Sequence, residues 1–204
     1  MTLILTAWIA LATAAISPGP NLVAVASRGL GSGRRSAFLV AAGLACGAFL
    51  WSSLTAVGFG ALFQAYPGLL RLLGVLGGGY LLWLGIKGWR AALTGEGGQI
   101  APVSGRGAAR DFLHGLAVTA TNPKVALLWA SLSTFVGPAL KYPGLLLVFI
   151  CGSAAIVFVI YGTYGWLFST GRMRRVYRRF QSASEALFGT LFGGLGAVMV
   201  HRAL

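Results

Sequence analysis

Long apolar runs without charge alternate along the chain with short gaps that carry most of the basic residues. A helix needs about 20 mostly apolar residues to cross the hydrocarbon core of a membrane. The pattern therefore predicts six spanning helices, near residues 1–27, 37–62, 69–90, 112–136, 144–169 and 185–203. Residues 94–110 are rich in glycine and polar side chains, and they are expected to form the longest linker.

Composition supports a membrane protein. Hydrophobic residues make up 57% of the 204 residues and charged residues 9%, whereas a soluble domain carries roughly 25% charged residues. This excludes a water-soluble enzyme, a disordered tail and a disulfide scaffold. There is no phosphate-binding glycine loop, no serine motif with a histidine in reach and no cluster of metal ligands. We expect neither enzymatic activity nor a metal or cofactor.

The basic residues that give the net charge of +13 are distributed along the chain as expected for a membrane protein. Twelve Lys and Arg follow the first, third and fifth predicted helices, and three lie on the opposite side. The positive-inside rule then puts both termini outside the cytoplasm. If the first helix fails to cross, five spans remain and the N-terminus lies inside. Basic residues confined to short gaps do not favour nucleic-acid binding.

The two halves of the chain share features at a constant offset. A shift of 105 residues brings Ser17-Pro18 onto Asn122-Pro123 and Cys46-Gly47 onto Cys151-Gly152. For the third and sixth helices the shift is 115, and it brings Gly74, Gly78 and Gly79 onto Gly189, Gly193 and Gly194. Each half then holds three helices, so the second enters the membrane inverted. The predicted fold is all-α, with two inverted three-helix repeats at 1–93 and 111–204 joined by a cytoplasmic linker at 94–110.

Two of the predicted helices are broken by proline. Pro18 and Pro20 lack an N–H, and Ser17 is a suitable cap with Pro18 in the first helical position. Asn122 and Pro123 repeat this start signal in the fourth helix. A restarted helix presents unpaired N–H groups that attract a carboxylate. A merely structural kink is the alternative at each proline.

Lys124 lies at the centre of the fourth span, where an ammonium is costly unless it faces a cavity or a partner. The candidate substrate-binding residues are therefore those at the two breaks: Ser17, Pro18, Gly19, Pro20, Asn21, Asn122, Pro123 and Lys124. Candidate coupling residues are the acids next to predicted spans, Asp111 and Glu185. Glu185 also suits the start of the sixth helix, as an acid at a helix N-terminus.

Three motifs together resemble the lysine exporter (LysE/RhtB-type) translocator family. They are Ile16-Ser17-Pro18-Gly19-Pro20-Asn21, Gly78-Gly79-Tyr80-Leu81-Leu82-Trp83-Leu84-Gly85, and Phe112-Leu113-His114-Gly115 followed by Asn122-Pro123-Lys124. The resemblance implies a multi-pass exporter of amino acids or related small metabolites in the bacterial inner membrane, driven by an ion gradient. Its partners would be the substrate and the lipid bilayer, with a homo-oligomer left open. Glu185, where relatives often carry glycine, departs from the family pattern.

Two other functions remain open at this stage. Cys46 and Cys151 correspond across the repeat and could form a membrane thiol-redox carrier, although apolar surroundings make a thiol inert. A channel is the other alternative. The scarcity of acids within the predicted spans favours an uncharged amino acid over lysine or arginine as the substrate.

Overall fold

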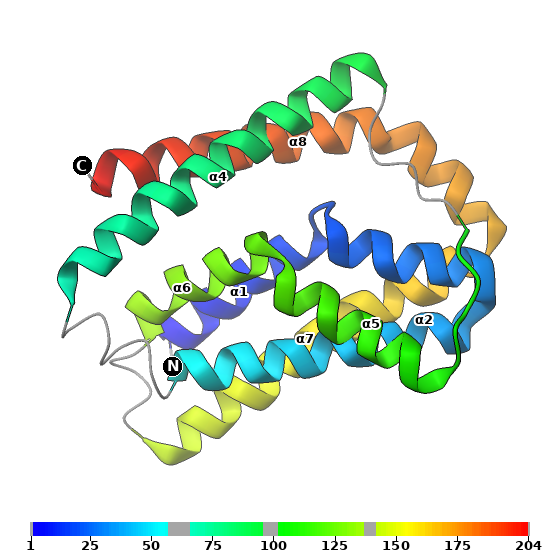
Figure 1. Ribbon diagram of the computed structural model, residues 1–204, viewed down its shortest axis with the longest axis horizontal. Coiled ribbons are helices and arrows are strands. Elements are labelled where there is room, and N and C mark those ends of the chain that lie inside the picture. The colour runs from blue at the N-terminus through cyan, green and yellow to red at the C-terminus, as the bar shows by residue number, and fades with distance from the viewer. Residues whose placement is uncertain (1, 57–65, 96–101, 137–141, 204) are drawn as a thin grey trace. The chain divides into compact units, whose positions relative to one another are not determined.

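The computed structural model describes residues 2–56, 66–95, 102–136 and 142–203, and every regular element in these ranges is helical (Figure 1). The all-helical prediction is therefore confirmed for the described chain. The chain divides into two compact units, one formed by residues 1–60 with 100–174 and the other by residues 61–99 with 175–204.

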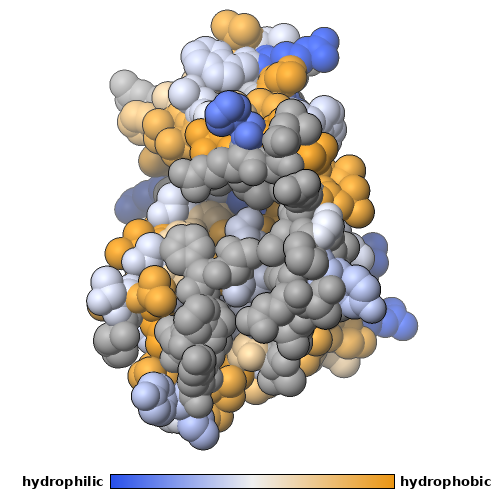
Figure 2. Space-filling model, turned by 90° about the vertical axis from the view of Figure 1, so that its left-hand side faces the viewer, coloured by the Kyte–Doolittle hydropathy of each residue, from blue (hydrophilic) through white to orange (hydrophobic). Residues whose placement is uncertain are grey.

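Two of the described helices are long and apolar enough to cross a membrane, α2 (Pro20–Leu54) and α7 (Pro143–Phe168). Shorter apolar stretches occur at α1 (Thr2–Ile16) and, at Glu185–Val198, within α8 (Gly171–Ala203). Many large apolar side chains of the described residues are exposed, and Figure 2 shows several orange hydrophobic groups among the coloured residues of one face. Such a surface is typical of a protein that contacts lipid rather than water.

The first break lies two residues later than its predicted register. We expected Ser17 as the cap and Pro18 in the first helical position, but α1 ends at Ile16 and α2 begins at Pro20 with Gly19 as its cap. The residue before a proline is disfavoured in helical conformation. Pro20 therefore keeps Gly19 extended, and the new helix cannot begin before Pro20.

Helix α2 contains a reversal of the chain at Gly33. This glycine has φ +77°, in the left-handed region that glycine adopts without steric cost. Figure 1 shows that the chain reverses within α2, and the non-helical backbone at Gly33 divides α2 into two helical segments, residues 20–32 and 34–54. The second segment is the predicted second span as far as Leu54; predicted residues 57–62 lie outside the described residues.

The second break follows the prediction. Helix α5 (Ala108–Thr121) ends at Asn122, which is extended, and α6 (Pro123–Val136) begins directly after it. Asn122 Oδ1 accepts a hydrogen bond of 3.1 Å from Lys124 N, and Asn122 O accepts one of 3.0 Å from Val125 N. Asn122 is therefore an N-cap with Pro123 in the first position.

In the first unit, α2 packs against α5 and α7, and α1 packs against α6 and α7. Glycines permit the closest of these approaches. A Cβ atom added at Gly43 of α2 would lie 2.0 Å from Phe112 O, and one at Gly115 of α5 would lie 2.1 Å from Val40 O. The two backbones thus touch along a seam that has no space for larger side chains.

In the second unit, α4 (Pro67–Thr94) packs antiparallel against α8 (Gly171–Ala203), of which this unit contains the part from Arg175 on (Figure 1). Gly78 and Gly85 of α4 approach Gly196 and Gly193 of α8, which makes a seam of small residues. Helix α8 begins well before the predicted start at 185, so the arginine-rich segment at 172–179 is helical rather than a loop. No proline or glycine interrupts residues 172–188, and charge alone does not stop a helix. The expectation that Glu185 opens the sixth helix is therefore wrong.

The seam between α2 and α5 can be tested with Gly115→Ala. A Cβ at this position has no space beside Val40 O, so we expect a loss of about 1–3 kcal/mol in the free energy of unfolding. Thermal unfolding in detergent measures it. Gly79→Ala is the control, because its Cβ would meet no atom within 4 Å. A Gly115→Ala variant as stable as the control contradicts the tight seam.

Candidate functional site

The two helix breaks meet through their asparagines. Asn122 Nδ2 donates a hydrogen bond of 2.9 Å to Asn21 Oδ1, and Asn21 Nδ2 donates one of 3.1 Å to Thr119 Oγ1. Asn21 and Asn122 are 6% and 4% exposed. Residues about 100 positions apart in the sequence thus form one buried polar cluster.

Lys124 reaches from the second break to the first. Its Nζ donates to Ser17 Oγ, to Ser17 O at 3.4 Å and to Pro18 O at 3.5 Å. Ser17 Oγ also donates a 2.8 Å hydrogen bond to Ala14 O, and the Tyr164 hydroxyl donates one of 3.0 Å to Ile16 O. Side chains thereby satisfy the carbonyl groups that the end of α1 leaves without helical partners.

A cavity of about 30 Å³ lies at this junction. That volume accommodates water but not an amino acid. Ser17, Gly19, Asn21, Asn122 and Lys124 line it, whereas Pro18, Pro20 and Pro123 do not. The prolines break the helices, and the residues beside them supply the lining.

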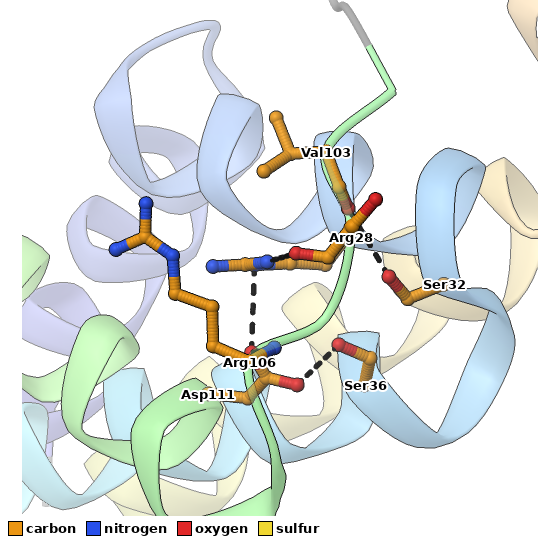
Figure 3. A network of polar contacts seen from close by, with 7 residues as sticks. Arg28, Ser32, Ser36, Val103, Arg106 and Asp111 are labelled. Atoms are coloured by element: carbon orange, nitrogen blue, oxygen red, sulfur yellow. Dashed lines mark hydrogen bonds and ion pairs between the residues drawn. The ribbon is translucent and has the colours of Figure 1, made fainter.

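A second polar cluster holds the end of the linker against α2 (Figure 3). Residues 102–107 run along the first segment of α2, where Val103 N donates a 3.0 Å hydrogen bond to Ser27 O and Ser32 Oγ donates one of 3.1 Å to Val103 O. Arg28 Nη1 donates to Ser104 O. A Cβ at Gly31 would lie 2.4 Å from Val103 O, so glycine is needed for this approach.

Asp111, one of the candidate coupling residues, is the centre of this second cluster. Arg28 Nε lies 3.5 Å from Asp111 Oδ1, and the side chains of the pair are 3% and 4% exposed. The carboxylate also accepts hydrogen bonds from Ser36 Oγ and from Arg106 N. Glu185, the other candidate, lies in the second unit, where its backbone carbonyl faces Gly88 of α4.

Several residues of the two clusters were not identified from the sequence. Thr119 precedes Asn122 by three residues and so shares its helical face, which is a usable signal. Tyr161 and Trp129 line the cavity from α7 and α6, but each stands in an apolar run that predicts only burial. Arg28 was counted only as a loop charge, because nothing in the sequence pairs it with an acid 83 positions away.

The second cluster can be tested with Asp111→Asn. This change leaves Arg28 buried without a countercharge, which costs about 3–5 kcal/mol, and it should release residues 102–107. We expect faster tryptic cleavage after Arg106, followed by mass spectrometry on protein in detergent. Glu185→Gln, in the other unit, should leave the cleavage rate unchanged. Equal rates for wild type and Asp111→Asn contradict a role of the carboxylate in holding the segment.

Comparison with known proteins places this arrangement in a family. Residues 12–203 match the family model described as LysE type translocator. The threonine efflux protein of Escherichia coli (strain K12) is 30% identical over 92% of each chain. The leucine efflux protein of Klebsiella pneumoniae is 30% identical over 88% of this chain and 86% of its own. The homoserine/homoserine lactone efflux protein of Salmonella typhimurium is 30% identical over 90% of this chain and 89% of its own. No solved structure matches the chain.

These matches confirm the resemblance noted in the sequence and leave the thiol-carrier alternative without support, since the relatives are named as efflux proteins. In the structure Cys46 and Cys151 are both free thiols. The chain therefore belongs to the LysE type translocator family of membrane transport proteins.

Proposed function

We propose that this translocator exports uncharged amino acids across the bacterial inner membrane, driven by an ion gradient. The cavity at the two helix breaks carries the proposal. Helix ends of opposite polarity meet there beside Lys124, and none of the described residues that line the cavity is acidic. The relatives named for efflux of threonine, leucine and homoserine support the same class of substrate.

The carboxylate of the substrate would bind at the start of α2. The first helical hydrogen bond there runs from Val23 N to Gly19 O at 3.0 Å, so the N–H groups of Asn21 and Leu22 precede it. A helix N-terminus attracts anions, and Lys124 adds a positive charge. At the start of α6, by contrast, Asn122 already accepts hydrogen bonds from the first backbone N–H groups. These groups would bind the substrate carboxylate only when Asn122 turns away.

The side chain of the substrate would face the apolar part of the lining, which includes Leu44, Val125 and Leu128. An additional ammonium group, as in lysine, would find no carboxylate in this lining, and burying an unpaired charge is costly. This favours uncharged substrates over basic ones. The cavity of about 30 Å³ is too small for either, so binding would require the cavity to widen.

We further propose six spans in two inverted repeats, 1–93 and 111–204, with 94–110 as a cytoplasmic linker. The division into units supports this plan, because each half gives its first two spans to one unit and its third to the other. The packing glycines support it too: a Cβ at Gly47 would meet Thr119 of α5, and one at the corresponding Gly152 would meet Trp8 of α1.

The positive-inside rule places residues 102–107 and the Arg28–Asp111 pair on the cytoplasmic side. Rocking of one repeat against the other would expose the cavity to each side in turn. Asp111 and Glu185 are the acids through which an ion gradient would act. Asp111 already links the linker to α2, so a change in its charge would alter that contact.

Counterflow in liposomes tests the function. Vesicles loaded with unlabelled L-threonine, L-leucine or L-homoserine should accumulate the same labelled amino acid, whereas L-lysine and L-glutamate should not be exchanged. The variant Cys46→Ala/Cys151→Ala should behave as wild type. Absence of exchange for all three uncharged amino acids contradicts the proposal. Flux without exchange indicates a pore.

The first break can be tested with Pro18→Ala/Pro20→Ala. Each proline disfavours a continuous helix by about 3 kcal/mol, so the double variant should allow the break to close and should slow exchange by roughly tenfold or more, which corresponds to about 1.4 kcal/mol in the barrier. Initial rates are normalised to inserted protein. Pro143→Ala, at the first position of an unbroken helix, is the control. A rate equal to that of the control excludes a role for the break.

A further inference from the structure

The carbonyl end of α1 already binds a cation in this structure. Three oxygens, which we call the α1 oxygen cluster, surround the Lys124 ammonium: Ser17 Oγ, Ser17 O and Pro18 O. Ser17 is 2% exposed. The last carbonyl groups of a helix carry a partial negative charge, so this end is suited to a cation.

The two sides of the first break have opposite polarity. The α1 oxygen cluster faces the start of α2, where the N–H groups of Asn21 and Leu22 precede the first helical bond. Ser17, Gly19 and Asn21 all line the cavity between them. A free amino acid carries an ammonium and a carboxylate on one carbon, so the broken helix offers a complementary group to each.

We propose that the α1 oxygen cluster is the ammonium subsite of the transporter, and that Lys124 occupies it as an internal substitute while the carrier is empty. The inference rests on the proposed function, in which the same cavity binds an amino acid. On loading, the ammonium of the substrate replaces that of Lys124, and Lys124 turns to the carboxylate. The net charge of the site is then the same before and after binding, because a zwitterion adds none.

This exchange gives Lys124 two different tasks. In the empty carrier it satisfies buried carbonyl groups that would otherwise lack partners, which permits the closed cavity to form. In the loaded carrier the substrate takes over that task. The empty carrier therefore depends on Lys124 more strongly than the loaded carrier does, and a solute without an ammonium group cannot displace it.

The test compares net efflux with exchange in liposomes for Lys124→Met, which keeps an unbranched side chain of similar length but removes the ammonium group. The probe is whichever of L-threonine, L-leucine and L-homoserine wild type exchanges. In net efflux the carrier must return without substrate to the side from which it exports. In exchange it returns with a substrate molecule bound, so the empty carrier does not have to cross. We expect the ratio of net efflux to exchange to fall about tenfold or more, the effect of one charged hydrogen bond. Methylammonium on the receiving side should restore the ratio.

Lys87→Met is the matched control, since Lys87 lies exposed over the Trp83 ring of α4, and its ratio should equal that of wild type. A parallel fall of net efflux and exchange in Lys124→Met, or no change in either, overturns the inference. If wild type exchanges none of the three probes, the proposed function itself fails.

Competition on wild type gives a second test that does not depend on a folded variant. L-Leucinamide, which has the ammonium but no carboxylate, should inhibit exchange, whereas the 2-hydroxy analogue of leucine, which has only the carboxylate, should inhibit at least about tenfold more weakly. Equal inhibition by the two compounds overturns the ammonium subsite while leaving amino-acid exchange intact.

Discussion

Backbone N–H and C=O groups that lose their helical partners inside a membrane must find others, because lipid offers none. The prolines at positions 18, 20 and 123 interrupt two helices, so at two places backbone groups need new hydrogen-bond partners. Side chains meet this need in both places: Asn122 caps the start of α6, and Lys124 covers the end of α1. The polar cavity is thus a direct consequence of breaking apolar helices, and its residues are the ones that repair the breaks.

Arg28 and Lys124, two cations of the first unit, are compensated differently. Arg28 is paired with Asp111, whose carboxylate is further held by Ser36 and Arg106. Lys124 is bound by uncharged oxygens at the end of α1. Separating a buried ion pair costs several kcal/mol, whereas one ammonium can replace another on neutral oxygens at little cost. The contrast suits the arginine to a structural contact and the lysine to a site whose occupant changes.

Features that depend on neighbouring residues could be predicted from the sequence, whereas contacts between residues far apart in the sequence could not. Proline acts locally, so both breaks and the cap at Asn122 were predictable. The register of the first break depended on the effect of Pro20 on Gly19, which the choice of Ser17 as cap overlooked. The early start of α8 differs from the prediction because a dense run of arginines is compatible with a helix as well as with a loop. The Arg28–Asp111 pair joins segments 83 positions apart, and no local pattern carries that information.

The first segment of α2 links the two polar clusters. Asn21 lies near its start and binds Asn122 at the cavity, while Arg28 lies seven residues later and binds Asp111. Seven residues are about two helical turns, or about 10 Å along the axis, so the two side chains project from one face of one rigid segment. In the proposed transport cycle, separation of the breaks would move this segment relative to Asn122. The same movement would displace Arg28 from Asp111 or carry residues 102–107 with it, so opening of the cavity would be mechanically connected to the contact with the linker.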